Sequence, residues 1–143
     1  MKSVSDEVMQ ELRGLGSDVR EALKNGDADK AQSLLERGWK LIPEPKAECD
    51  ISISKALASI RLMAQSNKPQ LAVRWIDELK KLPVSKIDAE PDFLMGVAYF
   101  EMGDLDGAFA HFDKSSKMSK GRCFQGEDKK YQEFYKKHAA GKK

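Results

Sequence analysis

The sequence has 143 residues, a length that suits one domain, and 41% of its residues are hydrophobic and 34% are charged. Aromatic residues make up only 8%, and with 10 glycines and 5 prolines this composition favours an all-helical protein over a β-sandwich. The net charge of +2 selects no class of partner, and no stretch approaches the roughly 18 consecutive apolar residues of a membrane span.

The first eight residues, M-K-S-V-S-D-E-V, contain acidic side chains where a signal peptide would need an apolar run. We therefore expect a cytoplasmic protein. Cys49 and Cys123 have no CxxC spacing and no histidine nearby, so the sequence predicts two reduced thiols and no metal site.

Apolar residues recur at spacings of three or four from residue 4 to residue 23, which predicts one face of a helix. They are Val4, Val8, Leu12, Leu15, Val19 and Leu23. Ser3 and Ser5 precede this pattern as candidate caps. Gly14 and Gly16 interrupt it, at a cost of roughly 1 kcal/mol each relative to alanine. We expect one long helix with a weak middle or two helices nearly in line, and the pattern leaves open whether residues 1–11 extend the first helix.

Asp27 is positioned to cap a second helix over residues 28–41, which a Pro-Glu-Pro sequence at residues 43–45 ends. A third helical face lies within residues 47–66. Pro69 then suits the first position of a fourth helix, which ends at Pro83.

Residues 91–116 contain the clearest pattern, two helices joined by a tight turn at Gly103 and Asp104. Glycine accepts the left-handed conformation that ends a helix, and aspartate caps the next one. Gly96 lies on one face of the first helix, and Ala108 and Phe112 lie on one face of the second. The small residues allow a close approach of the two helices, and the aromatic ring fills the remaining space.

This pattern resembles the tetratricopeptide repeat, L-G-x-x-Y…A-x-x-x-F, a helix–turn–helix unit of 34 residues. Ala31, Ala72 and Ala108 are the equivalent alanines of three such units, at about residues 12–45, 53–86 and 89–122. The resemblance implies an all-α fold in which three helical hairpins form a right-handed stack. The sequence as a whole, residues 1–143, is then one helical-repeat domain.

The C-terminal part predicts a final helix over residues 128–138, with a capping helix at about residues 127–139 covering the last hairpin. Its apolar face holds Tyr131, Phe134, Tyr135 and His138. The preceding loop offers Arg122 and Phe124 as a second candidate partner contact. From residue 117 onward nine basic and three acidic residues give a local charge of +6, and residues 141–143 are expected to fray.

No catalytic motif is present in the sequence. His111 and His138 are the only histidines, neither has a recognisable nucleophile motif nearby, and no phosphate-binding glycine loop or metal motif occurs. We therefore expect no enzyme, no cofactor and no catalytic or metal-binding residues.

The resemblance implies that the first helix of each pair lines a concave groove that binds another protein. Nine residues would then face the partner: Arg20, Lys24, Leu57, Arg61, Gln65, Phe93, Val97, Phe100 and Glu101. This combination suits a partner with an acidic segment and an aliphatic or aromatic anchor. Alternatively, Phe93 and Phe100 pack against the C-terminal helix. The positions at which some relatives clamp a chaperone's C-terminal carboxylate offer only Arg20 as a cation, so that ligand is not expected.

The sequence ending is similar to small, stand-alone bacterial tetratricopeptide proteins, some of which accompany secreted toxins. That likeness implies a toxin-immunity protein, a monomer or weak dimer that neutralises one toxin domain. An adaptor or secretion chaperone that binds an extended peptide is the first alternative. The second is nucleic-acid binding, because Lys129, Lys130, Lys136 and Lys137 alternate with Tyr131 and Tyr135.

Overall fold

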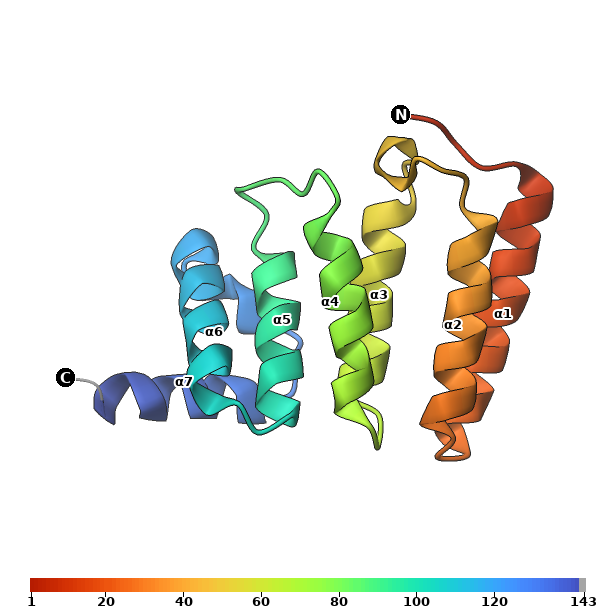
Figure 1. Ribbon diagram of the computed structural model, residues 1–143. Coiled ribbons are helices and arrows are strands. Elements are labelled where there is room, and N and C mark those ends of the chain that lie inside the picture. The colour runs from red at the N-terminus through yellow and green to blue at the C-terminus, as the bar shows by residue number, and fades with distance from the viewer. Residues whose placement is uncertain (142–143) are drawn as a thin grey trace. The chain divides into compact units, whose positions relative to one another are not determined.

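The computed structural model describes residues 1–141, and within that range it is all-helical with no strand (Figure 1). The all-helical prediction is therefore confirmed. The chain divides into two compact units, Met1–Pro83 and Val84–Lys143, here called unit 1 and unit 2. Lys142 and Lys143, which belong to the predicted basic segment and frayed end, lie outside the described residues. The single stacked domain remains a prediction.

Unit 1 contains two helical hairpins. The first joins α1 (Asp6–Lys24) to α2 (Ala28–Leu41), and the second joins α3 (Ser52–Ala64) to α4 (Val73–Lys80). Two short 3-10 segments, η1 (Lys46–Glu48) and η2 (Pro69–Ala72), precede α3 and α4 respectively.

Helix α1 is continuous in spite of Gly14 and Gly16, so the first of the two expected arrangements is found. The Ser5 hydroxyl caps it by accepting a hydrogen bond from the Val8 amide at 3.2 Å. The carboxylate of Asp27 caps α2 in the same way. Helix α2 has the predicted bounds, because its cap and its terminating prolines are both local signals.

Helix α3 (Ser52–Ala64) lies within the predicted range of residues 47–66, but residues 47–51 stay outside it. The reason is a contact with the N-terminal segment. Lys2 donates its amide to the Glu48 carbonyl at 2.7 Å and accepts the Asp50 amide at 2.9 Å. These bonds hold residues 48–50 outside the helix.

The second hairpin of unit 1 is tied to the first by a buried polar contact. Trp75 on α4 is fully buried, and its indole N–H donates to the side-chain oxygen Oε1 of Gln32 on α2 at 2.8 Å. The side-chain nitrogen Nε2 of Gln32 in turn donates to the Leu71 backbone carbonyl at 3.3 Å. A buried indole N–H needs such a partner, so this bond fixes α4 against α2.

Unit 2 contains a third hairpin, α5 (Glu90–Glu101) and α6 (Leu105–Ser119), followed by η3 (Arg122–Phe124) and α7 (Lys129–Gly141). Gly103 has a φ of +85°, and the Asp104 carboxylate accepts the Gly107 amide at 3.0 Å. The predicted turn is therefore confirmed. Gly96 lets the helices meet closely, because a Cβ built there would lie 2.5 Å from Cδ1 of Phe112.

Aromatic rings fill the core of unit 2. The Phe112 ring lies 5.5 to 6.3 Å, centroid to centroid, from four other rings that come from α5, η3 and α7. They belong to Phe93, Phe124, Tyr131 and Phe134. Helix α7 thus covers the α5–α6 hairpin through its aromatic face, as expected for the C-terminal helix, although it extends to Gly141. Over residues 1–141, no helix has both the length and the apolar character needed to cross a membrane.

Candidate functional site

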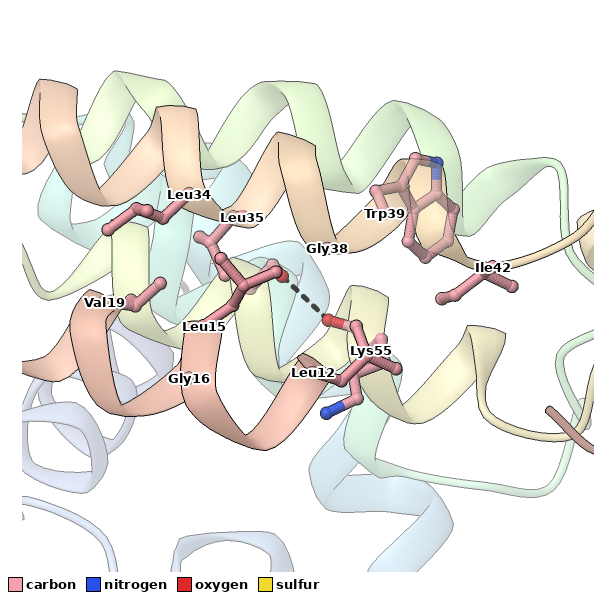
Figure 2. Close-up of a pocket in the computed structure, with 11 residues that line it drawn as sticks. Leu12, Leu15, Gly16, Val19, Leu34, Leu35, Gly38, Trp39, Ile42 and Lys55 are labelled. Atoms are coloured by element: carbon pink, nitrogen blue, oxygen red, sulfur yellow. Dashed lines mark hydrogen bonds between the residues drawn. The ribbon is translucent and has the colours of Figure 1, made fainter. Parts of the chain in front are cut away.

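Unit 1 contains a small apolar pocket bounded by α1, α2 and α3, here called the α1–α3 pocket (Figure 2). Its volume is about 60 Å³. Nine of its eleven lining residues are apolar: Leu12, Leu15, Gly16, Val19, Leu34, Leu35, Gly38, Trp39 and Ile42. The other two, Lys55 and Ser59, come from α3. The pocket therefore offers an apolar surface with a cation on one side.

The walls on α1 and α2 follow from the apolar stripe of α1 and a glycine on α2. Gly38 is buried, and a Cβ built on it would lie 3.3 Å from Leu12 Cδ2 and 3.7 Å from Leu15 Cδ1. This glycine lets α1 lie close along α2. Helix α3 makes fewer contacts with α2 than α1 does, and the cavity lies between these three helices.

The wall on α3 contains two polar side chains, those of Lys55 and Ser59, which differ in whether they have a partner. The Ser59 hydroxyl donates to the Lys55 carbonyl one turn earlier, at 2.8 Å, and so is satisfied within the helix (Figure 2). The Lys55 ammonium, by contrast, has no ion pair or side-chain hydrogen bond among residues 1–141. It is the only ionisable group in the lining.

A second cation lies next to the pocket. Arg20 is exposed on α1, and its Nη1 is the nearest atom, at 3.7 Å, to a Cβ built on the pocket residue Gly16. Within the described part of the chain, its guanidinium also forms no ion pair or hydrogen bond. Because the lining contains no carboxylate, the electrostatic potential at the pocket is expected to be positive.

The structure separates the unit 1 residues that the repeat pattern assigned to a groove. Arg20 lies beside the α1–α3 pocket, but Lys24, in the last turn of α1, does not line it. Leu57 is 6% exposed and belongs to the core, so the prediction that it faces a partner is wrong. Arg61 is half-buried and Gln65 is exposed, and both already take part in interactions within the chain.

In unit 2 the same prediction is wrong for Phe93 and Val97, which are 2% and 0% exposed. Phe93 packs against the rings of Phe112, Phe124 and Tyr131, which leaves it no surface for a partner. Phe124 was predicted as part of the second candidate contact, and this prediction is wrong for the same reason, since the residue is only 7% exposed. The alternative, in which the phenylalanines of α5 seat the C-terminal helix, accounts for these contacts.

Of the remaining candidates in unit 2, Phe100 and Glu101 contact the C-terminal helix and Arg122 contacts the end of α6. Phe100 is half-buried against Tyr131 and Phe134, with centroids 5.5 and 5.2 Å away. Glu101 pairs with the Lys130 ammonium at 3.2 Å. Arg122 is exposed, and its Nε donates to the Ser119 carbonyl at 3.1 Å, as a cap for the end of α6.

The aromatic residues that suggested nucleic-acid binding are engaged in the core of unit 2. Tyr131 is 0% exposed, and Tyr135 stacks on Phe124 with centroids 5.4 Å apart. The Tyr135 hydroxyl donates to Asp113 at 2.7 Å. Neither ring presents a free face on which a base could stack.

A cluster of polar side chains joins α5 to α6. Asp92, on the buried side of α5, accepts at 2.9 Å from His111 Nδ1 on α6 if that nitrogen carries the proton. The His111 ring stacks on Tyr99 with centroids 5.3 Å apart and planes 9° from parallel. Lys114 adds a longer contact to Asp92 at 3.6 Å. The cluster thus gives a buried carboxylate its required partners between two packed helices.

Sequence reasoning missed Lys55, although a local signal was present. The residues three and four positions away from Lys55 in the sequence are Ile51, Ser52, Ala58 and Ser59, none of which is acidic. Lys55 therefore has no carboxylate partner within its own helix. The neighbours of Arg20 at the same spacings are likewise not acidic.

No protein-family model, curated protein or solved structure matches this chain. Among residues 1–141, no group of three or more His, Cys, Asp and Glu side chains is placed to hold a metal ion. Function must therefore be inferred from the geometry of the chain itself.

Proposed function

We propose that the protein is a non-catalytic binding module that accepts an anchor side chain of a partner protein in the α1–α3 pocket. The carrying observation is the pocket itself, an apolar cavity of about 60 Å³ beside two cations that have no partner in the described chain. Binding sites of this kind combine an apolar surface with a few placed polar groups. The one hydroxyl in the lining is used within its helix, which favours binding over chemistry.

We also propose that the three hairpins are tetratricopeptide-like repeats. Gly26 and Gly103 both have positive φ, +72° and +85°, and each is followed by a capping aspartate. The three equivalent alanines, Ala31, Ala72 and Ala108, are all 0% exposed. In such repeats the first helices of the pairs carry the binding face, which suits a pocket with walls on α1 and α3.

Two glycines on α1 provide a matched test of the binding proposal. Gly16 lines the pocket, and only the end of the Arg20 side chain lies within 4 Å of a Cβ built there. Gly14 does not line the pocket, and nothing lies within 4 Å of its Cβ position. Both Gly16→Leu and Gly14→Leu should remove the same helix penalty, but only the first should obstruct the pocket.

The experiment uses the purified protein to capture partners from its source cells, with identification by mass spectrometry and titration of the purified partner. Gly16→Leu should weaken the complex by about ten-fold or more, which is about 1.4 kcal/mol. Gly14→Leu should bind like the wild type. Equal affinity of all three proteins would refute the binding site.

The narrower role of a toxin-immunity protein is a hypothesis within this proposal. Co-expression with a toxin encoded next to this protein should restore growth, and Gly16→Leu should reduce the rescue while Gly14→Leu preserves it. Failure of the wild type to rescue growth would reject the immunity role but not the binding module. An adaptor or chaperone role would then remain, with an extended peptide as ligand.

A further inference from the structure

The shape of the α1–α3 pocket restricts the anchor that can fill it. One water needs roughly 10–15 Å³ of such space, and a dry apolar cavity that binds benzene measures about 150 Å³. A cavity of about 60 Å³ is therefore too small for an aromatic ring. It suits a branched aliphatic side chain of about four carbons, such as that of leucine.

The charges beside the cavity restrict what accompanies the anchor. Lys55 is half-buried and lines the cavity, and its ammonium has no carboxylate partner within the described chain. Arg20 adds a second cation beside Gly16. Cations without a partner favour a carboxylate ligand, because the two groups form charge-assisted hydrogen bonds.

We propose that the partner segment in this pocket presents a branched aliphatic side chain close to an acidic side chain of the same segment. The aliphatic group occupies the cavity between α1, α2 and α3, and the carboxylate pairs with Lys55 and Arg20. This inference rests on the proposed function and names the chemistry of the partner. The acidic group is an internal Asp or Glu of the partner.

The test uses an array of blocked 12-residue peptides in a Gly/Ser background. Each peptide carries one Leu and one Glu, one to four positions apart, and the comparison peptides replace Leu by Ala or Phe, or Glu by Gln. Replacing Leu by Ala in the best Leu–Glu peptide should lower its affinity about ten-fold or more, since three carbons are removed from an apolar site. Replacing Glu by Gln should lower the affinity of that peptide about five-fold, as expected for the loss of a partly exposed ion pair.

Protein variants then locate the two interactions. The double variant Lys55→Gln with Arg20→Gln should remove the preference for Glu over Gln and preserve the preference for Leu over Ala. Lys24→Gln is the matched control, because Lys24 is an exposed cation on α1 that does not line the pocket, and it should preserve both preferences. Tryptophan fluorescence of Trp39 and Trp75 checks that each variant has a folded unit 1.

Several results would overturn the inference. These are equal binding of the Glu and Gln peptides, a Glu preference that survives the double variant Lys55→Gln with Arg20→Gln, stronger binding of the Phe peptide than of the Leu peptide, or no binding of any peptide at about 1 mM, the weakest affinity worth measuring. Stronger binding of a peptide with a free C-terminal leucine would assign the carboxylate to a chain terminus instead. In each case the capture experiment with Gly16→Leu stands by itself, so the partner chemistry can fail while the binding site holds.

Discussion

Units 1 and 2 each pack a helical hairpin through a glycine, but they differ in what faces that glycine. In unit 2 the Phe112 ring lies against Gly96, and rings from η3 and α7 close around it. In unit 1 the leucines Leu12 and Leu15 face Gly38, and a cavity of about 60 Å³ remains next to α3. A glycine facing an aromatic ring thus gives a filled core, whereas one facing leucines leaves room for a ligand.

The largest expected effect comes from creating a cavity in unit 2. Phe112 is fully buried and contacts four rings, so Phe112→Ala should lower the free energy of unfolding by about 3–5 kcal/mol. Native-state hydrogen exchange should show the loss at the amides of α5, α6 and α7. Both tryptophans lie in unit 1, so their fluorescence follows that unit separately. A loss below about 1 kcal/mol would mean that the aromatic core is not closely packed.

Overpacking the same contact should have the next largest effect. Gly96→Ala places a Cβ 2.5 Å from a buried ring carbon, and should cost about 1–3 kcal/mol in spite of the better helix propensity of alanine. Gly14→Ala, which meets no atom within 4 Å, is the matched control and should gain about 0.5–1 kcal/mol. Urea unfolding followed by circular dichroism measures both. If the two variants shift the midpoint in the same direction, Gly96 is not a packing requirement.

Tyr135 should make the stability of unit 2 depend on alkaline pH. Burial and the hydrogen bond to Asp113 raise the pKa of Tyr135 above its ordinary value of 10.0. The folded state therefore favours the protonated phenol. The stabilisation is complete below pH 10 and decreases as pH rises through the raised pKa.

Tyr135→Phe tests this dependence. It should cost about 0.5–1 kcal/mol at neutral pH through the lost hydrogen bond, and the difference from the wild type should shrink above pH 10. Urea unfolding at several pH values measures the difference. A gap that is constant up to pH 11.5 would contradict the raised pKa.

An effect as small as that of Tyr135→Phe concerns the stability of unit 1. Gly16→Leu should raise the free energy of unfolding by roughly 0.5–1 kcal/mol, because leucine has the better helix propensity and the pocket offers space for the side chain. Tryptophan fluorescence during urea unfolding follows this change. Destabilisation would show that the space beside Gly16 is not available, and would remove the contrast between the two units.

The sequence was sufficient for the local features of the fold. The bounds of α2, the turn at Gly103 and Asp104 and the aromatic face of α7 all follow from caps, breakers and periodicity within a few residues. The exact start of α3 within residues 47–66 was not predictable, because the backbone bonds from Lys2 to residues 48–50 link positions far apart in the chain. No local pattern contains such a contact.

The candidate site was predicted only in part. The resemblance to the repeat assigned both Arg20 and Leu57 to a groove, yet Arg20 lies beside a pocket and Leu57 is in the core. A helical pattern shows on which face of its helix a residue lies. It does not show which other element packs against that face. The cover depends on the volumes of side chains from other helices, as with the rings that bury Phe93.

The sequence by itself determined an all-helical chain, its turns and caps, and the small residues at which helices meet, since each of these depends on the conformational preferences of a few adjacent residues. Only the tertiary structure decided where packing is complete and where it is not. The cavity beside Gly16 exists because three helices meet with side chains that do not fill the space between them, and Lys55 lines it without an ion-pair partner among residues 1–141. That mismatch of volume and charge is a property of residues distant in sequence, and the proposed binding function depends on it.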